Sequence, residues 1–159
     1  MPKSTPADIA EEVKRIYAEL DQRPFERHCT AQTTCCRFQL TGQTPYLTKA
    51  EALVAAAAWK KTGRGRLADG GKEGICPMLE RATGRCLIYA DRPFGCRTHF
   101  CKAAGGPYAR KQVADLIHRL EDLSRTLGHT EAMPMQRAME EAMRDPSPRG
   151  VPTQPYRRY

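Results

Sequence analysis

The sequence predicts a mainly α-helical fold: a small single domain of about four helices, with irregular cysteine segments that a bound metal cross-links. Three observations lead to this expectation. The chain has 159 residues, 40% of them hydrophobic, which suffices for one modest core. Four stretches place apolar residues at helical spacing. The seven cysteines fall in two groups, one before and one after the second of those stretches.

The first helix is predicted over residues 6–21. Thr5 is a favourable N-cap, and Pro6 suits the first helical position. One face carries the apolar residues Ile9, Val13, Ile16, Tyr17 and Leu20. A second helix is predicted from the cap Thr48 to about Thr62, because Glu51 completes a reciprocal capping arrangement with Thr48 and Gly63 is a typical stop.

The longest helix is predicted from Pro107 to about Leu127, with Gly128 as its stop, and we expect it to be the main packing partner of the first. Its apolar stripe is Val113, Leu116, Ile117, Leu120, Leu123 and Leu127. A fourth helix over 134–144 carries methionines that we expect to pack in the core rather than bind metal. The domain is thus predicted over residues 1–144, with a helical C-terminal part from 107 and an extended Pro- and Arg-rich tail over 145–159.

The composition also suggests where the protein works and what it meets. The formal net charge is +8, which favours an acidic protein or a nucleic acid as partner. Basic residues gather in the glycine-rich loop of residues 63–74, with Arg64 and Arg66, and in the tail, with Arg157 and Arg158. No stretch resembles a signal peptide or a membrane span, so we expect a cytoplasmic protein without a membrane partner.

A reducing cytoplasm decides how the cysteines are interpreted, since disulfides rarely persist there. An odd number of cysteines also leaves one unpaired in any disulfide scheme. Any single cysteine could be a small core residue, but seven of seven in that role is implausible. We therefore predict metal ligands at Cys29, Cys35, Cys36, Cys76, Cys86, Cys96 and Cys101.

Four thiolates complete one tetrahedral zinc site or one four-iron cluster, so these cysteines suffice for one site with spares, or for two if another ligand joins. His28 and His99 are the candidates for that ligand, because each lies within two residues of a cysteine. The adjacent pair Cys35 and Cys36 would point to opposite sides of an extended backbone. Arginines beside the cysteines, such as Arg85 and Arg97, could balance the thiolate charge.

Several motifs resemble the YkgJ-type cysteine-cluster family over about residues 29–101. They are Cys76-Pro-Met-Leu, Cys86-Leu-Ile-Tyr, Arg92-Pro93 and the run from Cys96 to Cys101. The family typically begins C-x-x-C-x-x-C-C. Here Cys29, Cys35 and Cys36 fit this pattern, and Gln32 stands at the second cysteine position. The resemblance implies a zinc- or iron-chelating domain, and a similar domain occurs in flagellin lysine methylases thought to use an iron–sulfur cluster.

We hypothesise a metal centre, an iron–sulfur cluster or zinc with a slight preference for iron, held first by Cys36, Cys86, Cys96 and Cys101 and next by Cys76 and Cys35. It would serve redox chemistry or electron transfer. The alternative is a zinc-stapled binding module that engages nucleic acid or an acidic protein through the basic loop and tail. The residues leave open whether the chain is an enzyme, because no base partner accompanies a nucleophilic Cys29 or Cys35.

Overall fold

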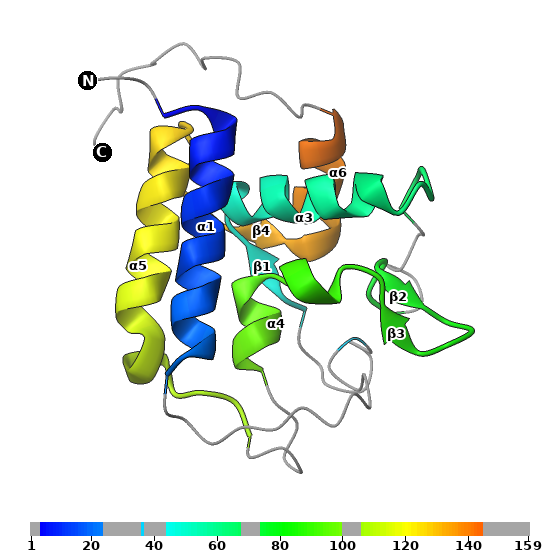
Figure 1. Ribbon diagram of the computed structural model, residues 1–159, viewed down its shortest axis with the longest axis horizontal. Helices are drawn as coiled ribbons and strands as arrows, with labels where there is room; N and C mark the ends of the chain where they lie inside the picture. Colours follow the sequence, from blue (N-terminus) through cyan, green and yellow to red (C-terminus); the bar gives the residue numbers. More distant parts are fainter. Residues whose placement is uncertain (1–3, 24–35, 37–43, 68–73, 100–105, 145–159) are drawn as a thin grey trace.

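The computed structural model describes residues 4–23, 36, 44–67, 74–99 and 106–144. Within these ranges the chain is mainly helical, as predicted (Figure 1). The α-helices are α1 (Pro6–Asp21), α3 (Lys49–Lys61), α4 (Phe94–Thr98), α5 (Arg110–Thr126) and α6 (Met135–Arg144), and η2 (Tyr89–Asp91) is a 3₁₀ turn. None of these helices combines the length and the apolar character needed to cross a membrane.

The described residues form two short antiparallel strand pairs, one between distant segments and one within a hairpin. Strand β1 (Tyr46–Leu47) pairs with β4 (Met133–Pro134), with Tyr46 opposite Pro134. Strand β2 (Leu79–Glu80) pairs with β3 (Arg85–Cys86), with Leu79 opposite Cys86. The sequence predicts none of them, because two residues are too few for an alternating pattern to appear.

The capping residues fix the first two predicted helices. Helix α1 has the predicted bounds, and the Asp8 amide donates to the Thr5 hydroxyl at 3.2 Å while the Thr5 amide donates to the Asp8 carboxylate at 2.7 Å. Helix α3 begins after Thr48, whose amide donates to the Glu51 carboxylate at 3.0 Å. Gly63 follows α3 with φ of 70°, which confirms the predicted stop.

Helix α5 begins three residues later than predicted. The Tyr108 amide donates to the Thr98 carbonyl at 3.0 Å, which ties this segment to the end of α4, and the Gln112 side chain accepts from the Ala109 amide at 2.9 Å to cap the helix. At the other end, Gly128 has φ of 79° and the His129 amide donates to the Ser124 carbonyl at 3.0 Å, so the predicted glycine stop is correct. Helix α4 and η2 are not predicted, since segments this short show no helical period.

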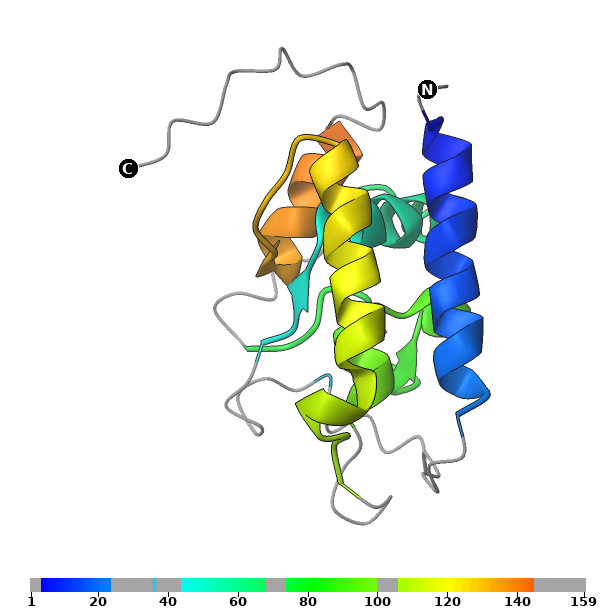
Figure 2. The same ribbon diagram turned by 90° about the vertical axis from the view of Figure 1, so that its left-hand side faces the viewer.

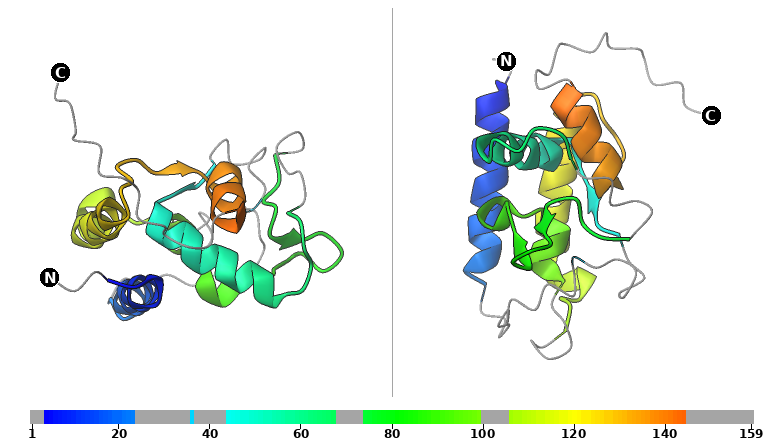
Figure 3. Two further views of the ribbon diagram at one scale, coloured as in Figure 1. Left: turned by 90° about the horizontal axis from the view of Figure 1, so that it is seen from above. Right: turned by 90° about the vertical axis from the view of Figure 1, so that its right-hand side faces the viewer.

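Helix α3 separates two cores. Helices α1 and α5 run side by side in opposite directions (Figure 2), and their apolar stripes pack with Ala50 and Val54 of α3 and with Phe94. Seen from above (Figure 3), α3 extends away from this pair and carries α6 along its side. Trp59 and the alanines of its opposite face pack with α6 and the β2–β3 hairpin in the second core. The sequence predicted α5 as the main packing partner of α1. In the structure, α1 packs against both α5 and α3.

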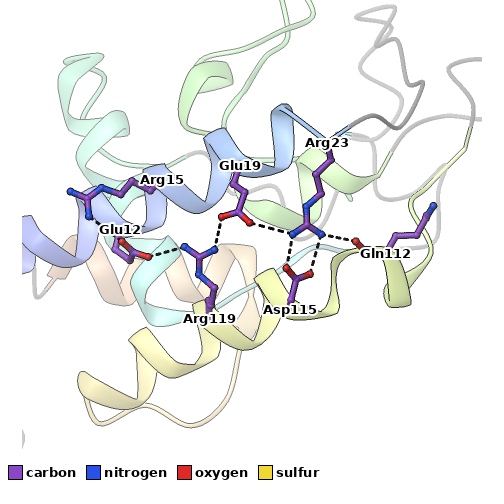
Figure 4. A network of polar contacts seen from close by, with 7 residues as sticks. All are labelled: Glu12, Arg15, Glu19, Arg23, Gln112, Asp115 and Arg119. Carbon is purple, nitrogen blue, oxygen red and sulfur yellow. Dashed lines mark hydrogen bonds and ion pairs between the residues drawn. The ribbon is translucent and has the colours of Figure 1, made fainter.

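An ion-pair ladder joins α1 to α5 along the outer side of the first core (Figure 4). Arg23 pairs with Asp115 through both guanidinium nitrogens, at 3.0 and 2.5 Å. Arg119 donates to Glu19 at 2.6 Å and to Glu12 at 2.9 Å. Exposed pairs contribute little one by one, but an alternating network also fixes the register of the two helices.

This ladder predicts a loss of stability in acid. Hydrogen bonds from Arg119 lower the pKa of Glu19, and those from Arg23 lower the pKa of Asp115. A carboxyl with a lowered pKa in the folded state stabilises the fold above its unfolded pKa of about 4, and this contribution disappears as the pH falls through the folded value.

We therefore expect the double variant E19Q/D115N to be less stable than wild type at about pH 6 and to lose less stability between about pH 5 and pH 3. Urea unfolding at each pH measures the difference. Parallel pH profiles for the two proteins would show that the ladder contributes nothing to acid sensitivity.

Candidate metal centre

The two cysteine groups meet at the backbone. The Cys76 amide donates to the Cys36 carbonyl at 2.7 Å, although Cys36 precedes α3 in the sequence and Cys76 follows it. Cys76 belongs to the second core, and Cys36 packs against it while half-buried. A metal that cross-links the cysteine segments requires the two cysteine groups to lie close together in the fold. The contact between Cys36 and Cys76 agrees with this requirement.

Cys86 reaches the same core from the β2–β3 hairpin. It lies opposite Leu79, and the hairpin is extended by a hydrogen bond of 2.9 Å from the Leu87 amide to the Met78 carbonyl. Gly84 closes the turn with φ of 67°, a backbone conformation that favours glycine. Cys86 is half-buried against the second core, so its sulfur is neither fully in solvent nor deep inside.

Cys96 comes from α4 and is also half-buried against the second core. Its amide donates to the Pro93 carbonyl at 3.0 Å in the first turn of the helix. Phe94 packs in the first core, so α4 bridges the two cores. Cys36, Cys86 and Cys96 are thus all half-buried, and all three pack against the second core.

Cys76 is different. Only 6% of its surface is exposed, and its thiol lies 3.6 Å from the Met135 sulfur inside the second core. Met135 and Met139 of α6 are both buried there, which confirms that these methionines are packing residues. Cys76 therefore has the surroundings of a small core residue.

The other predicted ligands lie outside the described residues: Cys29, Cys35, Cys101 and the neighbouring His28. His99 is the C-cap residue of α4 and is half-buried, with its amide donating to the Gly95 carbonyl. Among the residues that the structure describes, no three Cys, His, Asp or Glu side chains form a group that could hold a metal. The complete ligand set stays a prediction.

Arg97, next to Cys96, is held by backbone and aromatic groups. Its Nε donates to the Arg92 carbonyl at 2.8 Å, and one Nη donates to the Ala90 carbonyl. The other Nη donates to the Asp21 carboxylate at 3.1 Å, and the guanidinium lies 4.3 Å from the centre of the Tyr17 ring. The side chain is 6% exposed. Its contacts join α4 to η2 and to the end of α1.

Glu51 carries a buried carboxylate, and this role is missing from the sequence prediction. Its Oε2 accepts from the Thr48 amide at 3.0 Å and from the Thr48 hydroxyl at 2.9 Å. Its Oε1 accepts from the Phe94 amide at 2.8 Å and from the Tyr17 hydroxyl at 3.3 Å. The sequence does hold one signal for the burial of Glu51. Apolar residues surround it on the helix predicted here, a pattern typical of a buried helix rather than of one with a solvent-facing side.

Opposing effects act on the pKa values of Glu51 and Tyr17. Burial raises the pKa of Glu51, and its hydrogen bonds from Thr48, Phe94 and Tyr17 act in the opposite direction. Burial and then the nearby Glu51 charge raise the pKa of Tyr17 well above its ordinary value, while Arg97 lowers it. Glu51, Tyr17 and Arg97 form a buried polar group, named the anchor network below, that joins α1, α3 and α4.

A protein-family model identifies the family of this chain. The family CxxCxxCC, described as a putative zinc- or iron-chelating domain, matches residues 28–121, more than half of the chain. The chain belongs to the CxxCxxCC family. The match continues past residue 101, where the sequence resemblance was expected to end, and includes the first part of α5. No curated protein and no solved structure matches the chain.

The described residues of this CxxCxxCC domain fit the metals in the family description. Zinc and iron both take cysteine sulfur, and thiolates bind best where an apolar wall limits access of water. Cys36, Cys86 and Cys96 meet that requirement because each is half-buried against the second core. The donor chemistry is therefore soft sulfur, and hard cations such as magnesium do not suit it.

The anchor network generates a stability prediction. Glu51→Gln should lower the free energy of unfolding by about 1–3 kcal/mol, because an amide offers one acceptor oxygen and leaves either the Thr48 or the Phe94 amide unpaired inside the protein. Urea unfolding measures it, with the exposed Glu11→Gln as control, expected within about 0.5 kcal/mol of wild type. Equal stability of Glu51→Gln and this control would show that relief from burying a charge balances the lost hydrogen bond.

Proposed function

We propose that this chain holds a zinc ion or an iron–sulfur cluster through Cys36, Cys86, Cys96 and Cys101. The observation that carries the proposal is that Cys36, Cys86 and Cys96 are each half-buried and packed against the second core. These described cysteines do not form a three-ligand group by themselves, so metal binding would have to draw their sulfurs together. These cysteines come from both sides of α3 in the sequence, and the hydrogen bond from the Cys76 amide to the Cys36 carbonyl brings the two sides together. Membership of a family described as a putative zinc- or iron-chelating domain supports metal binding.

Cys76 and Cys35 rank second as ligands. The Cys76 thiol faces Met135 in the second core, where a thiolate would be an unpaired charge among apolar groups. Cys35 lies outside the described residues, and Cys36 has 3₁₀ rather than the expected extended backbone, so the sequence argument that the two side chains point to opposite sides does not apply and Cys35 stays second on the sequence alone.

We favour iron slightly over zinc. Zinc sites commonly take pairs of cysteines with two to four residues between them, as Cys96 and Cys101 have, but Cys86 and Cys96 are separated by nine residues. An iron–sulfur cluster supplies one-electron redox chemistry when bound, which makes electron transfer the proposed activity. The chain's own contribution would be to hold the sulfurs and to exclude water with the apolar side chains of the second core.

The decisive experiment is metal analysis with an absorption spectrum on protein purified without oxygen. We expect metal in the wild type, strong loss in Cys86→Ser and Cys96→Ser, and a smaller loss in Cys76→Ala, because Cys76 ranks second as a ligand. Brown protein with iron and sulfide that bleaches on reduction identifies the cluster, and colourless protein with stoichiometric zinc identifies zinc. Metal-free wild type, or equal loss in all three variants, would overturn the proposed ligand set.

A second candidate function is a zinc-stapled binding module for an acidic partner. Arg64 and Arg66 follow α3, Arg81 and Arg85 lie in the hairpin, and all four are exposed. Glu80 lies within this group: its carboxylate hydrogen-bonds Thr83 and pairs with Arg64 at 2.5 Å, and both contacts lower its pKa. In addition to the hydrogen bonds from Thr83 and Arg64, the charge of Arg85 lowers the pKa of Glu80. Four exposed arginines in these two segments outnumber this one carboxylate, which favours an acidic partner.

An acidic protein suits these arginines better than single-stranded nucleic acid. Base stacking needs exposed aromatic rings. Trp59, which precedes the basic loop, is buried and donates its indole N–H to the Gly65 carbonyl at 2.8 Å. Tyr89, which follows the hairpin, is exposed, but the Arg92 guanidinium covers one face of its ring at 3.8 Å. The basic tail, with Arg157 and Arg158, lies outside the described residues.

Neutralising three of the arginines tests this candidate, with Arg64 kept so that its pair with Glu80 stays intact. The variant R66Q/R81Q/R85Q should bind a poly-glutamate peptide about tenfold more weakly than wild type at low salt, since each exposed ion pair contributes up to about 1 kcal/mol. The control K14Q/K111Q removes two charges from α1 and α5 and should bind as wild type does. Unchanged affinity in the triple variant, or loss of duplex DNA binding in its place, would reject an acidic protein as the partner at this surface.

A further inference from the structure

We propose that Glu51 and Arg97 are positioning residues that hold Cys96 in place for metal binding. The inference rests on the proposed function, because it gives Cys96 a metal to bind. It goes further by assigning a role to two buried charged residues that belong to no predicted ligand set. Both residues act through α4, the short helix that carries Cys96.

Helix α4 cannot fix its own position. It has five residues, and an isolated helix of that length is unstable in water. Its N-cap residue is Pro93, which supplies no capping hydrogen bond from its own side chain. The location of the Cys96 sulfur therefore depends on the contacts that α4 makes with other elements.

Glu51 anchors the start of α4. Its carboxylate accepts the Phe94 amide at 2.8 Å, while its other oxygen is held by the Thr48 amide and hydroxyl. Since Thr48 begins α3, the same carboxylate joins the first turn of α3 to the first residue of α4. Phe94 lies two residues before Cys96, so the anchor acts within one helical turn of the sulfur.

Arg97 anchors α4 from the other side of Cys96. It binds the Arg92 and Ala90 carbonyls, the Asp21 carboxylate and the face of Tyr17. A planar guanidinium can serve several acceptors at once, which a lysine ammonium cannot do with the same geometry. Cys96 thus lies between two anchors, one at Phe94 and one at Arg97.

Tyr17 connects the anchors to the rigid part of the molecule. Its hydroxyl donates to Glu51 at 3.3 Å and its ring lies against the Arg97 guanidinium, while α1 itself is locked to α5 by the ion-pair ladder. Residues that orient a metal ligand in this way typically change metal affinity by about 10–100-fold when they are replaced. We expect that range for Glu51 and Arg97.

The test follows metal retention in the full-length, metal-loaded protein purified without oxygen. Glu51→Gln and Arg97→Lys should release metal to a chelator at about 10–100-fold lower chelator concentration than wild type. They should also shift the absorption of the centre that stays bound, read directly for an iron–sulfur cluster and after cobalt substitution for zinc. Tyr17→Phe keeps the ring against Arg97 and loses the hydrogen bond to Glu51, so it should release metal at a chelator concentration between those of wild type and Glu51→Gln. Thermal unfolding is recorded for every variant.

The control is Arg119→Gln, which breaks the ladder between α1 and α5 and touches neither α4 nor the anchor network. It should lower thermal stability and leave metal retention and absorption unchanged. If Arg97→Lys and Arg119→Gln lose metal in proportion to their loss of stability, with no change in absorption, the positioning role is overturned. Wild type without metal would refute the proposed function itself, whereas metal-loaded wild type with fully retentive anchor variants refutes only this inference.

Discussion

The buried Glu51 carboxylate is the interaction on which the arrangement of the helices depends. Four hydrogen bonds from Thr48, Phe94 and Tyr17 converge on it, so one side chain fixes the start of α3, the start of α4 and the middle of α1. Burying a carboxylate is costly, and the raised pKa of Glu51 reflects that cost. Apolar contacts could hold the same helices together, but they would not specify the position of the Phe94 amide. A buried polar group of this kind gives a short element one defined place.

The position of α3 between two cores explains its composition. A helix with solvent on one side needs an apolar stripe, whereas α3 meets the α1–α5 pair on one face and α6 with the hairpin on the other. Small residues suit this place because alanines such as Ala52 and Ala55 allow close approach of the neighbouring helix on α3. In the sequence, α3 also lies between the two cysteine groups. Their backbones nevertheless meet in the folded chain, through the hydrogen bond from the Cys76 amide to the Cys36 carbonyl.

The helices could be predicted from the sequence because their signals are local. Caps at Thr5 and Thr48, glycine stops at Gly63 and Gly128, and apolar stripes all lie within one helix, and the helices form close to the predicted bounds. The cysteines indicated the class of site, and the family match agrees with it. The anchor network could not be predicted, because Glu51, Phe94 and Arg97 are joined only by tertiary contacts. A capping glutamate and an arginine beside a cysteine each have a sufficient local explanation, and nothing in the sequence says that they share Tyr17.

The two cores differ in the size and shape of their side chains, and this difference helps to explain a metal beside the second core. The first core is built from large branched and aromatic side chains, including Ile16, Leu116 and Phe94. The second relies on alanines, methionines and the cysteine-bearing segments, with Trp59 as its one buried aromatic residue among those described. Small and unbranched side chains bury less apolar surface and specify packing less tightly. A metal bound by Cys36, Cys86 and Cys96 would cross-link the hairpin and α4 at the weaker core, where binding energy becomes folding energy. The chelating site and the stability of the second core would then depend on the same bonds.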